Sequence, residues 1–305
     1  MYNIILVILS LFIYSCSNLP EKKIKTSEQS LKMMKSPIFK KPQLTEKIKN
    51  KSSYLINNGS VILVKHELKN DLKNIKIFCS GKKIDYVKDG LIIKFLISES
   101  YFSKRTKYKC VLSSRGNKLK VITKIIVKQK KYKEENINVA RKRVFLVKKD
   151  LNRVIKERRK LNKIYRNSSN ENLFNDSFKI PLLTKITSYY GTRRLYNNKK
   201  KSQHLGTDFR APEGTPIYSS NKGKVVFAGS LFYTGNTVIL DHGLGVFTVY
   251  AHLSKIQTKL NNYVDEKTLL GLSGKTGRVT GPHLHWGVKI QGHWVNGLDL
   301  VKINL

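Results

Sequence analysis

Short runs in which apolar and polar residues alternate, each closed by glycine or another turn-forming residue, recur through much of this chain. Alternation with a period of two places successive side chains on opposite faces of a strand, so these runs predict β-strands. They cover residues 75–79, 91–97, 121–127, 224–228, 236–240, 246–251 and 283–290. The chain is therefore expected to be mainly β.

The N-terminus has the features of an export signal. Residues 4–14 form an apolar run that is too short to span a bilayer and is typical of a signal-peptide core. The run ends at residues 13–16, which resemble a bacterial lipobox with Cys16 as the lipidated residue. We therefore expect a lipoprotein signal peptide at residues 1–15 and a flexible, lipid-anchored tether at residues 16–58. The alternative is an apolar strand with an incidental buried cysteine.

The next segment, residues 59–131, is expected to form a small antiparallel β-sandwich of about six strands, because turn signals separate its alternating runs. It contains Cys79 and Cys110, which would form a disulfide in an oxidising compartment. Closing a loop of about 32 residues would contribute about 3 to 4 kcal/mol in the chain-entropy model. The alternative is two separately buried thiols. The chain has no CxxC motif, which excludes a thiolate zinc site.

A helical pattern replaces the alternation at residues 132–168, which predict a long, basic amphipathic helix. Its apolar seam repeats at spacings of four and three, and its opposite face is crowded with Lys and Arg. Three roles stay open: a helix that docks an envelope protein partner, a strut packed on the neighbouring domains, or a basic helix on anionic lipid. The strut is favoured, because Arg158 in the seam argues against a long zipper. The seam consists of Ala140, Val144, Val147, Leu151, Val154, Arg158, Leu161 and Tyr165.

The charge balance is strongly basic. The 305 residues include 59 Lys and Arg against 20 Asp and Glu, a formal net charge of +39. Such a field favours an anionic partner, whether nucleic acid, anionic lipid or a carboxylate-rich polymer. Coding bias toward Lys, Asn and Ile is an alternative explanation. Charge alone therefore does not decide the function.

The last third of the chain carries closely spaced His and Asp residues suited to metal binding and proton transfer. His204 and Asp208 stand four residues apart, while His283 and His285 stand two apart and would share one face of a strand. Two histidines and a carboxylate meet the ligand count of a catalytic zinc site, in which the metal lowers the pKa of a water and polarises a carbonyl. Such a site also needs a proton acceptor and an oxyanion donor. His252, at the end of an alternating strand, and His283 are the spare pair.

Several further residues near these motifs are assigned no catalytic role. His242 is interpreted as a structural turn residue, because it stands between an aspartate and a glycine at a strand end. The others would either line a groove or serve packing and surface roles: Tyr189, Tyr190, Arg193, Arg194 and Tyr233.

Five motifs follow one another over the 110 residues from 186 to 295. They are SYYGTRR at 188–194, HLGTDF at 204–209 followed by GTPI at 214–217, GNTVILDHG at 235–243, YAHLS at 250–254, and SGKTG at 273–277 through GPHLH at 281–285. In this order they resemble the M23 family of zinc metallopeptidases, of the lysostaphin or LytM type. The resemblance implies an all-β peptidase domain at residues 169–305 that binds one Zn²⁺ ion.

Carried over motif by motif, the resemblance makes His204, Asp208 and His285 the zinc ligands. It makes His252 and His283 the catalytic pair, whose two roles are assigned jointly. Two departures touch no ligand. Trp286-Gly287 stands where many members have an aromatic residue followed by Glu, and Asn296-Gly297 replaces a common Asn-Pro.

The function implied is a zinc-dependent endopeptidase that hydrolyses peptide crosslinks of peptidoglycan. Stem-peptide carboxylates would suit the basic surface. The expected location is the cell envelope, with a membrane anchor through Cys16, and Ser17 favours the outer membrane facing the periplasm. The alternative is a non-catalytic LytM-like regulator that binds and activates other cell-wall hydrolases. A nucleic-acid partner is not expected, because the net charge is the only feature of the sequence that would suggest one.

Overall fold

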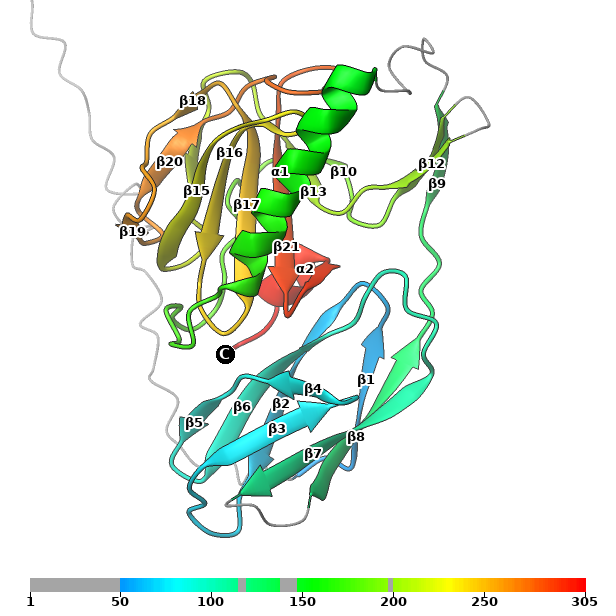
Figure 1. Ribbon diagram of the computed structural model, residues 1–305, viewed down its shortest axis with the longest axis vertical. Helices are drawn as coiled ribbons and strands as arrows, with labels where there is room; N and C mark the ends of the chain where they lie inside the picture. Colours follow the sequence, from blue (N-terminus) through cyan, green and yellow to red (C-terminus); the bar gives the residue numbers. More distant parts are fainter. Residues whose placement is uncertain (1–49, 115–118, 138–146, 197–199) are drawn as a thin grey trace, which may run out of the picture. The chain divides into compact units, whose positions relative to one another are not determined.

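Strands dominate the structure. The computed structural model describes residues 50–114, 119–137, 147–196 and 200–305. Within these ranges most elements are strands, which confirms the prediction of a mainly β chain (Figure 1). The stretch Lys47–Leu305 forms one compact unit.

The upstream strands form two sheets around a shared core. One sheet has the strand order β1-β8-β7-β3-β4 and the other the order β2-β6-β5. Ile77 from the first sheet and Ile93 from the second are both fully buried in the same apolar cluster, as a sandwich requires. The strands are β1 (Ser53–Asn57), β2 (Val61–Glu67), β3 (Ile75–Cys79), β4 (Lys82–Ile84), β5 (Val87–Asp89), β6 (Ile92–Ser98), β7 (Lys107–Ser114) and β8 (Lys120–Lys128).

Two features of this sandwich correct the expectation from sequence. Strand β1 lies within residues 16–58, which were expected to form a flexible tether, and it pairs with β8 in parallel, so the sandwich is not wholly antiparallel. The physical reason is Ile56, which is buried in the core and holds the segment at the sheet edge. A strand this short has too little alternation to stand out within a polar segment. Cys16 and the predicted signal peptide lie outside the described residues.

Cys79 and Cys110 stand opposite each other in the register of β3 and β7 and are joined by a disulfide. Their sequence separation is 31. Both side chains are buried in the core of the sandwich. The crosslink therefore ties together two strands that also pack as part of the apolar core.

The helix is shorter than the expected range of residues 132–168. Helix α1 spans Lys148–Arg166, whereas Glu134–Ile137 forms strand β9. Strand β9 pairs in parallel with β11 (Arg193–Tyr196). Pairing with a distant strand thus overrides the local helical pattern. Residues 138–146, which hold the first two positions of the predicted seam, lie outside the described residues.

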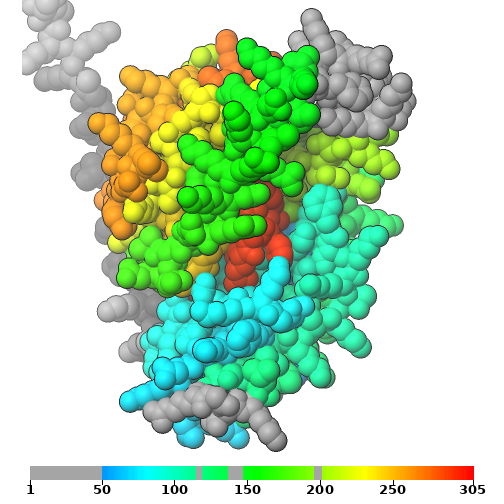
Figure 2. Space-filling view, viewed as in Figure 1, coloured from blue at the N-terminus to red at the C-terminus, as the bar shows by residue number. Residues whose placement is uncertain are grey.

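Helix α1 packs along its C-terminal half. Leu161 and Tyr165 contact an apolar cluster from the strands of the C-terminal domain, and the ring of Tyr165 meets Phe247 edge to face at 5.2 Å between centroids. Two earlier seam positions, Val147 and Leu151, are 64% and 46% exposed. Only part of the predicted seam is therefore buried. Figure 2 shows the green segment that contains α1 lying across later parts of the chain.

The C-terminal domain is built on one large sheet with the order β10-β13-β21-β17-β16-β15-β19, and β22 pairs with β21. Smaller sheets have the orders β14-β20-β18 and β12-β11-β9. The four alternating runs predicted in this region correspond to β15, β16, β17 and β21. The strands are β10 (Ile186–Ser188), β12 (Lys200–Gln203), β13 (Thr207–Arg210), β14 (Pro216–Tyr218), β15 (Gly223–Leu231), β16 (Gly235–Asp241), β17 (Val246–Leu253), β18 (Lys255–Ile256), β19 (Tyr263–Val264), β20 (Leu269–Leu272), β21 (His283–Ile290) and β22 (His293–Val295).

Direct hydrogen bonds join the sandwich to this domain. Ser98 Oγ donates to the carbonyl of Ile290 at 2.8 Å, and Gln291 Nε2 donates to the carbonyl of Leu96 at 2.8 Å. Leu96 also belongs to the main apolar cluster of the C-terminal domain. The two regions therefore pack against each other within one unit.

The last element is helix α2 (Gly297–Val301). Asn296 caps it, because its side chain accepts a hydrogen bond from the backbone N–H of Leu298 at 3.3 Å. The Asn-Gly pair found here thus begins a helix. Of the helices in the described part of the chain, neither is long and apolar enough to cross a bilayer.

Candidate metal centre

Three neighbouring strands bring the candidate residues together. Strand β21 lies between β13 and β17 and carries His283 and His285 at its start. In the antiparallel register, Asp208 of β13 stands opposite His285. His252 lies near the end of β17, one residue beyond the position that pairs with His285. His204 lies between β12 and β13, so all five residues named from the sequence meet at one place.

Three donor atoms converge within this group. His204 Nε2 lies 2.9 Å from Asp208 Oδ1 and 3.1 Å from His285 Nδ1, and the last two atoms are 2.8 Å apart. Bonds of about 2.0 to 2.1 Å to one tetrahedral ion would place ligand atoms about 3.3 Å apart, so the cluster is slightly tighter than a zinc site. Among the described residues these three side chains form a group able to hold a metal ion.

The hydrogen bonding of His204 shows that this cluster fits a cation. Its Nδ1 lies 3.1 Å from the carbonyl oxygen of Tyr189, which can only accept, so Nδ1 carries the proton. In the neutral ring Nε2 is then a lone pair aimed at a carboxylate oxygen of Asp208. Two lone pairs at this distance repel unless a cation lies between them. The donor set of two nitrogens and one oxygen is also one that zinc prefers.

Gly206, in the middle of the HLGTD motif, is required by the position of the candidate ligand His285. A Cβ at this residue would collide with the ring of His285 and lie 2.9 Å from the carbonyl oxygen of Trp286. Both neighbours belong to β21, which is fixed in the central sheet. The motif therefore needs glycine here because the backbone approaches a ligand ring closely.

His252 and His283 present free ring nitrogens beside the cluster. His252 Nδ1 donates to the carbonyl of Thr276 at 2.9 Å, and His283 Nδ1 donates to the carbonyl of Gly281 at 2.9 Å. Each ring therefore keeps Nε2 as a lone pair. The two ring centroids are 4.8 Å apart, and His283 Nε2 lies 3.9 Å from Asp208 Oδ1. The two rings thus present proton acceptors next to the three candidate ligands.

The backbone of His252 is held in an uncommon conformation. Its φ is 64°, in the left-handed region that costs a non-glycine residue about 1 to 3 kcal/mol. Its N–H donates to the carbonyl of Thr234 at 2.8 Å, which secures this geometry together with the bond from Nδ1. Backbone strain of this kind clusters at functional sites.

The electrostatics favour an ionised carboxylate at Asp208 beside neutral rings at His252 and His285. Burial alone would raise the pKa of Asp208, but the interactions with its neighbours His204 and His285 outweigh it and hold the pKa far below its usual range. Burial lowers the pKa of His285, and burial with the nearby His285 lowers that of His252 to about 3. These three groups therefore have the protonation states that a cation site and a proton acceptor need.

Other residues named from the sequence have structural roles. Tyr190 is buried, and its hydroxyl donates to the carbonyl of Trp294 at 2.8 Å. Tyr189 is exposed beside the cluster, and its carbonyl orients His204. Ser188 Oγ lies 3.1 Å from His204 Nδ1. Sequence reasoning included Ser188 in the SYYGTRR motif but gave it no role, because the contact with His204 forms only in the folded chain.

His242 is a buried core residue, which refines its interpretation as a turn residue. Its Nδ1 donates to the carbonyl of Lys222 at 2.5 Å, and its Nε2 lies 2.7 Å from Thr248 Oγ1. Its ring meets Phe178 edge to face. Burial lowers its pKa to about 4, so the ring is neutral and fully hydrogen-bonded.

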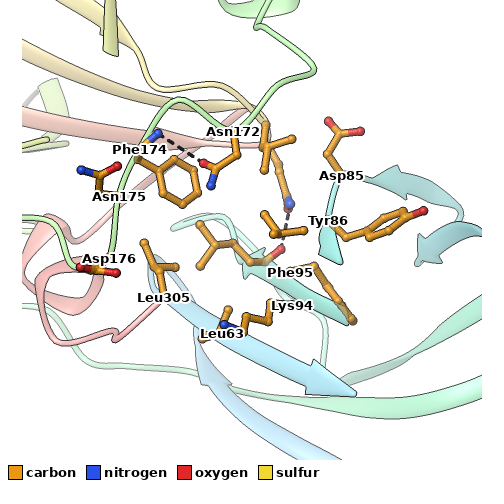
Figure 3. Close-up of a pocket in the computed structure, with 14 residues that line it drawn as sticks. Leu63, Asp85, Tyr86, Lys94, Phe95, Asn172, Phe174, Asn175, Asp176 and Leu305 are labelled. Carbon is orange, nitrogen blue, oxygen red and sulfur yellow. Dashed lines mark hydrogen bonds between the residues drawn. The ribbon is translucent and has the colours of Figure 1, made fainter. Parts of the chain in front are cut away.

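A separate cavity of about 220 Å³ lies away from the candidate centre, between the sandwich and the C-terminal domain (Figure 3). The apolar side chains of Leu63, Phe95, Phe174 and Leu305 line it, together with Asp85 and other polar residues. It contains none of the five residues of the candidate centre. The candidate centre at the start of β21 is therefore separate from this cavity.

Two histidines and an aspartate thus meet at one point of an all-β domain, with two further histidines beside them, and this donor set fits a metal ion. Comparison with known proteins identifies the family. The sequence profile of peptidase family M23 matches residues 202–297, which span all five residues of the candidate centre. The chain thus contains a peptidase family M23 domain.

Named relatives share this domain. A peptidoglycan DD-endopeptidase, ShyA, of Vibrio cholerae is 45% identical over 115 residues, and a DD-carboxypeptidase/endopeptidase, Mpg, of Neisseria meningitidis is 41% identical over 117 residues. These alignments cover 37% and 38% of this chain and 27% of each relative. The chain therefore spans about a quarter of the length of these relatives.

A solved structure extends the similarity beyond the domain. The crystal structure of a putative peptidase M23 from Pseudomonas aeruginosa matches with a TM-score of 0.62 and 27% identity. The match covers 78% of this chain and 92% of that one. The described architecture upstream of the peptidase domain thus has a counterpart in another M23 structure.

Proposed function

We propose that this chain is a zinc-dependent endopeptidase that hydrolyses peptide crosslinks of peptidoglycan. The observation that carries the proposal is the convergence of His204, Asp208 and His285 within hydrogen-bond distance of one another, with His252 and His283 beside them. The names of the M23 relatives support the substrate class. One Zn²⁺ ion held by the three ligands would polarise the scissile carbonyl and make a water more acidic.

The residues of the chain supply the proton transfers and the orientation. One free Nε2 of the pair His252 and His283 accepts the proton of the attacking water, and the other ring, once protonated at Nε2, donates a hydrogen bond to the oxygen that gains charge as the carbonyl is attacked. Their Nδ1 hydrogen bonds to backbone carbonyls fix both rings in the tautomer that leaves Nε2 available. The carbonyl of Tyr189 does the same for His204.

The alternative of a non-catalytic regulator receives no support from the site. Some LytM-like regulators have lost their ligands, whereas this chain has all three ligand candidates and both histidines of the pair in one cluster. An ionised Asp208 suits a cation ligand, and a neutral His252 suits a proton acceptor. The endopeptidase therefore accounts for features that regulation alone would not need.

The proposed setting is the bacterial envelope. The lipobox-like residues 13–16 support a lipid anchor at Cys16, and Ser17 supports the outer membrane, facing the periplasm where peptidoglycan lies. Stem-peptide carboxylates suit the net charge of +39. Labelling with a radioactive or alkyne-tagged fatty acid tests the anchor, which Cys16→Ala should abolish.

Digestion of purified peptidoglycan by the full chain tests the enzyme. We expect crosslinked muropeptides to decrease, a chelator to stop the reaction and added Zn²⁺ to restore it. The variant Asp208→Asn should leave the crosslinks intact under all conditions. A zinc-replete wild-type chain that releases nothing, yet stimulates a second hydrolase, would replace this proposal with the regulator.

A further inference from the structure

Arg194 lies beside the three-ligand cluster without belonging to it. It comes from β11, and its Nη2 donates to Ser188 Oγ at 2.9 Å and lies 4.0 Å from Asp208 Oδ2. Ser188 Oγ in turn lies 3.1 Å from Nδ1 of His204. The guanidinium group of Arg194 thus interacts with two of the three ligand candidates. It contacts His204 through a hydrogen bond to Ser188, and it forms an ion pair with Asp208.

The carboxylate that faces Arg194 comes from far upstream. The parallel pairing of β9 with β11 places Glu135 opposite Arg194 in register. Glu135 Oε2 lies 4.0 Å from Arg194 Nε, which is buried and has no hydrogen-bond partner among the described residues. The Arg194 side chain is 26% exposed, so charge interactions here are screened less than on an open surface. A segment before α1 therefore reaches the peptidase site.

We propose that Arg194 is a positioning residue for the metal ligands and that Glu135 holds it in place. The inference rests on the proposed zinc site. Arg194 keeps Ser188 Oγ against His204, which fixes the orientation of that ring, as outer hydrogen bonds do at metal sites. Glu135 offsets the positive charge that would otherwise lie next to a bound dication.

The arrangement needs the shape of arginine. Nη2 bonds to Ser188 while Nε faces Glu135, so two different nitrogens of the planar guanidinium group interact with two different residues. A lysine ammonium is a single point charge and cannot occupy both places. Arg194→Lys should therefore keep the charge and lose the positioning.

The same pair of strands supplies a matched control. Arg193 and Glu134 are the adjacent paired positions, and they form their own ion pair at 2.5 Å between Nη1 and Oε1. Side chains alternate along a strand, so this pair lies on the opposite face from Arg194 and Glu135. It has the same chemistry and strand pairing but no contact with Ser188 or Asp208 in the described structure.

The test measures Zn²⁺ affinity of the full chain by competition with a chromogenic chelator, together with the visible absorption spectrum of the Co²⁺ form. We expect Arg194→Gln, Arg194→Lys and Ser188→Ala to weaken zinc binding about 10- to 100-fold and to change the Co²⁺ spectrum. Glu135→Gln should weaken binding in the same direction by a smaller factor. The melting temperature of the metal-free protein should stay unchanged, and Arg193→Gln and Glu134→Gln should bind like wild type.

Wild-type affinity and an unchanged Co²⁺ spectrum in Arg194→Gln and Ser188→Ala would overturn the inference. An equal loss in Arg193→Gln would also overturn it, because the effect would then come from sheet packing. If Arg194→Gln fails to fold, Ser188→Ala and Glu135→Gln decide the question. A wild-type chain that binds no zinc would overturn the proposed function and this inference together, whereas wild-type binding with unaffected variants overturns the inference alone.

Discussion

Asp208 and His285 stand directly opposite each other in the register of β13 and β21, with Asp208 Oδ1 2.8 Å from His285 Nδ1. Two ligand candidates are therefore fixed by the backbone of the central sheet and not by loops. A site on paired strands holds its side chains more accurately than one on mobile segments. The third ligand candidate, His204, depends instead on contacts to Ser188 and Tyr189.

Removal of a proposed ligand should abolish zinc binding. Asp208→Asn keeps the shape of the side chain but loses the charge that attracts the cation, so we expect at least about a 100-fold loss of Zn²⁺ affinity. Isothermal titration calorimetry or chelator competition measures it. Near-wild-type affinity in Asp208→Asn would remove this residue from the site.

Removal of either histidine of the proposed catalytic pair should leave zinc binding intact and abolish activity. We expect His252→Ala and His283→Ala to retain one zinc ion per chain and to lose activity by about 10²- to 10⁴-fold, because proton transfer is lost while the ligands remain. Metal content by mass spectrometry and turnover on peptidoglycan give the two readouts. Full turnover in both variants would show that the pair is wrongly assigned.

Gly206→Ala should damage the metal site through sterics alone. The added methyl group would collide with the His285 ring, so zinc affinity should fall although no ligand is changed. Gly229→Ala is the matched control, because its Cβ would meet Phe227 at an ordinary 3.4 Å. Equal zinc affinity in the two variants would contradict the close approach at Gly206.

The buried His242 should make stability fall at acid pH. Its folded pKa is about 4 and its unfolded value 6.5, so between these values the unfolded chain binds more protons and stability rises with pH. The contribution is fully present above about pH 6.5 and is lost as the pH falls toward 4. The size is about 3 kcal/mol.

Urea unfolding of the metal-free protein at pH 7.0 and 4.5 measures this dependence. His242→Gln should be less stable at pH 7.0 and should show a shallower loss on acidification than wild type. Parallel pH profiles for the two proteins would show that another group causes the acid sensitivity.

The disulfide should stabilise the chain without touching the site. Replacing both Cys79 and Cys110 by Ser releases a loop with a sequence separation of 31, which should cost about 3 to 4 kcal/mol of unfolding free energy. Denaturant unfolding checks the loss, and zinc affinity should be unchanged. A double variant as stable as wild type would contradict a structural role for the bond.

The parts of the fold that alternation encodes were predictable. Strands β17 and β21 match the expected runs at 246–251 and 283–290 closely, because both lie inside the large sheet and glycines or turn residues bound them. The motif spacing likewise named all five residues that the structure brings together. Only the resemblance to a known family predicted that residues as far apart in sequence as His204 and His285 lie at one site.

The remaining features depend on distant pairing that leaves no local pattern. Strand β9 lies where a helix was expected, because its partner β11 follows about sixty residues later. The parallel pairing of β1 with β8 was hidden for the same reason. The contact of Ser188 with His204 and that of Glu135 with Arg194 exist only after these pairings form.

Mass spectrometry of one purified, crosslinked peptidoglycan dimer incubated with the zinc-loaded full chain in H₂¹⁸O tests the central claim most directly. The account predicts conversion of the dimer into two monomers, with one ¹⁸O atom in the new carboxyl group, by the wild type and not by His283→Ala. A dimer that stays intact with folded, zinc-replete wild-type protein would contradict the assignment of this site as a peptidoglycan endopeptidase.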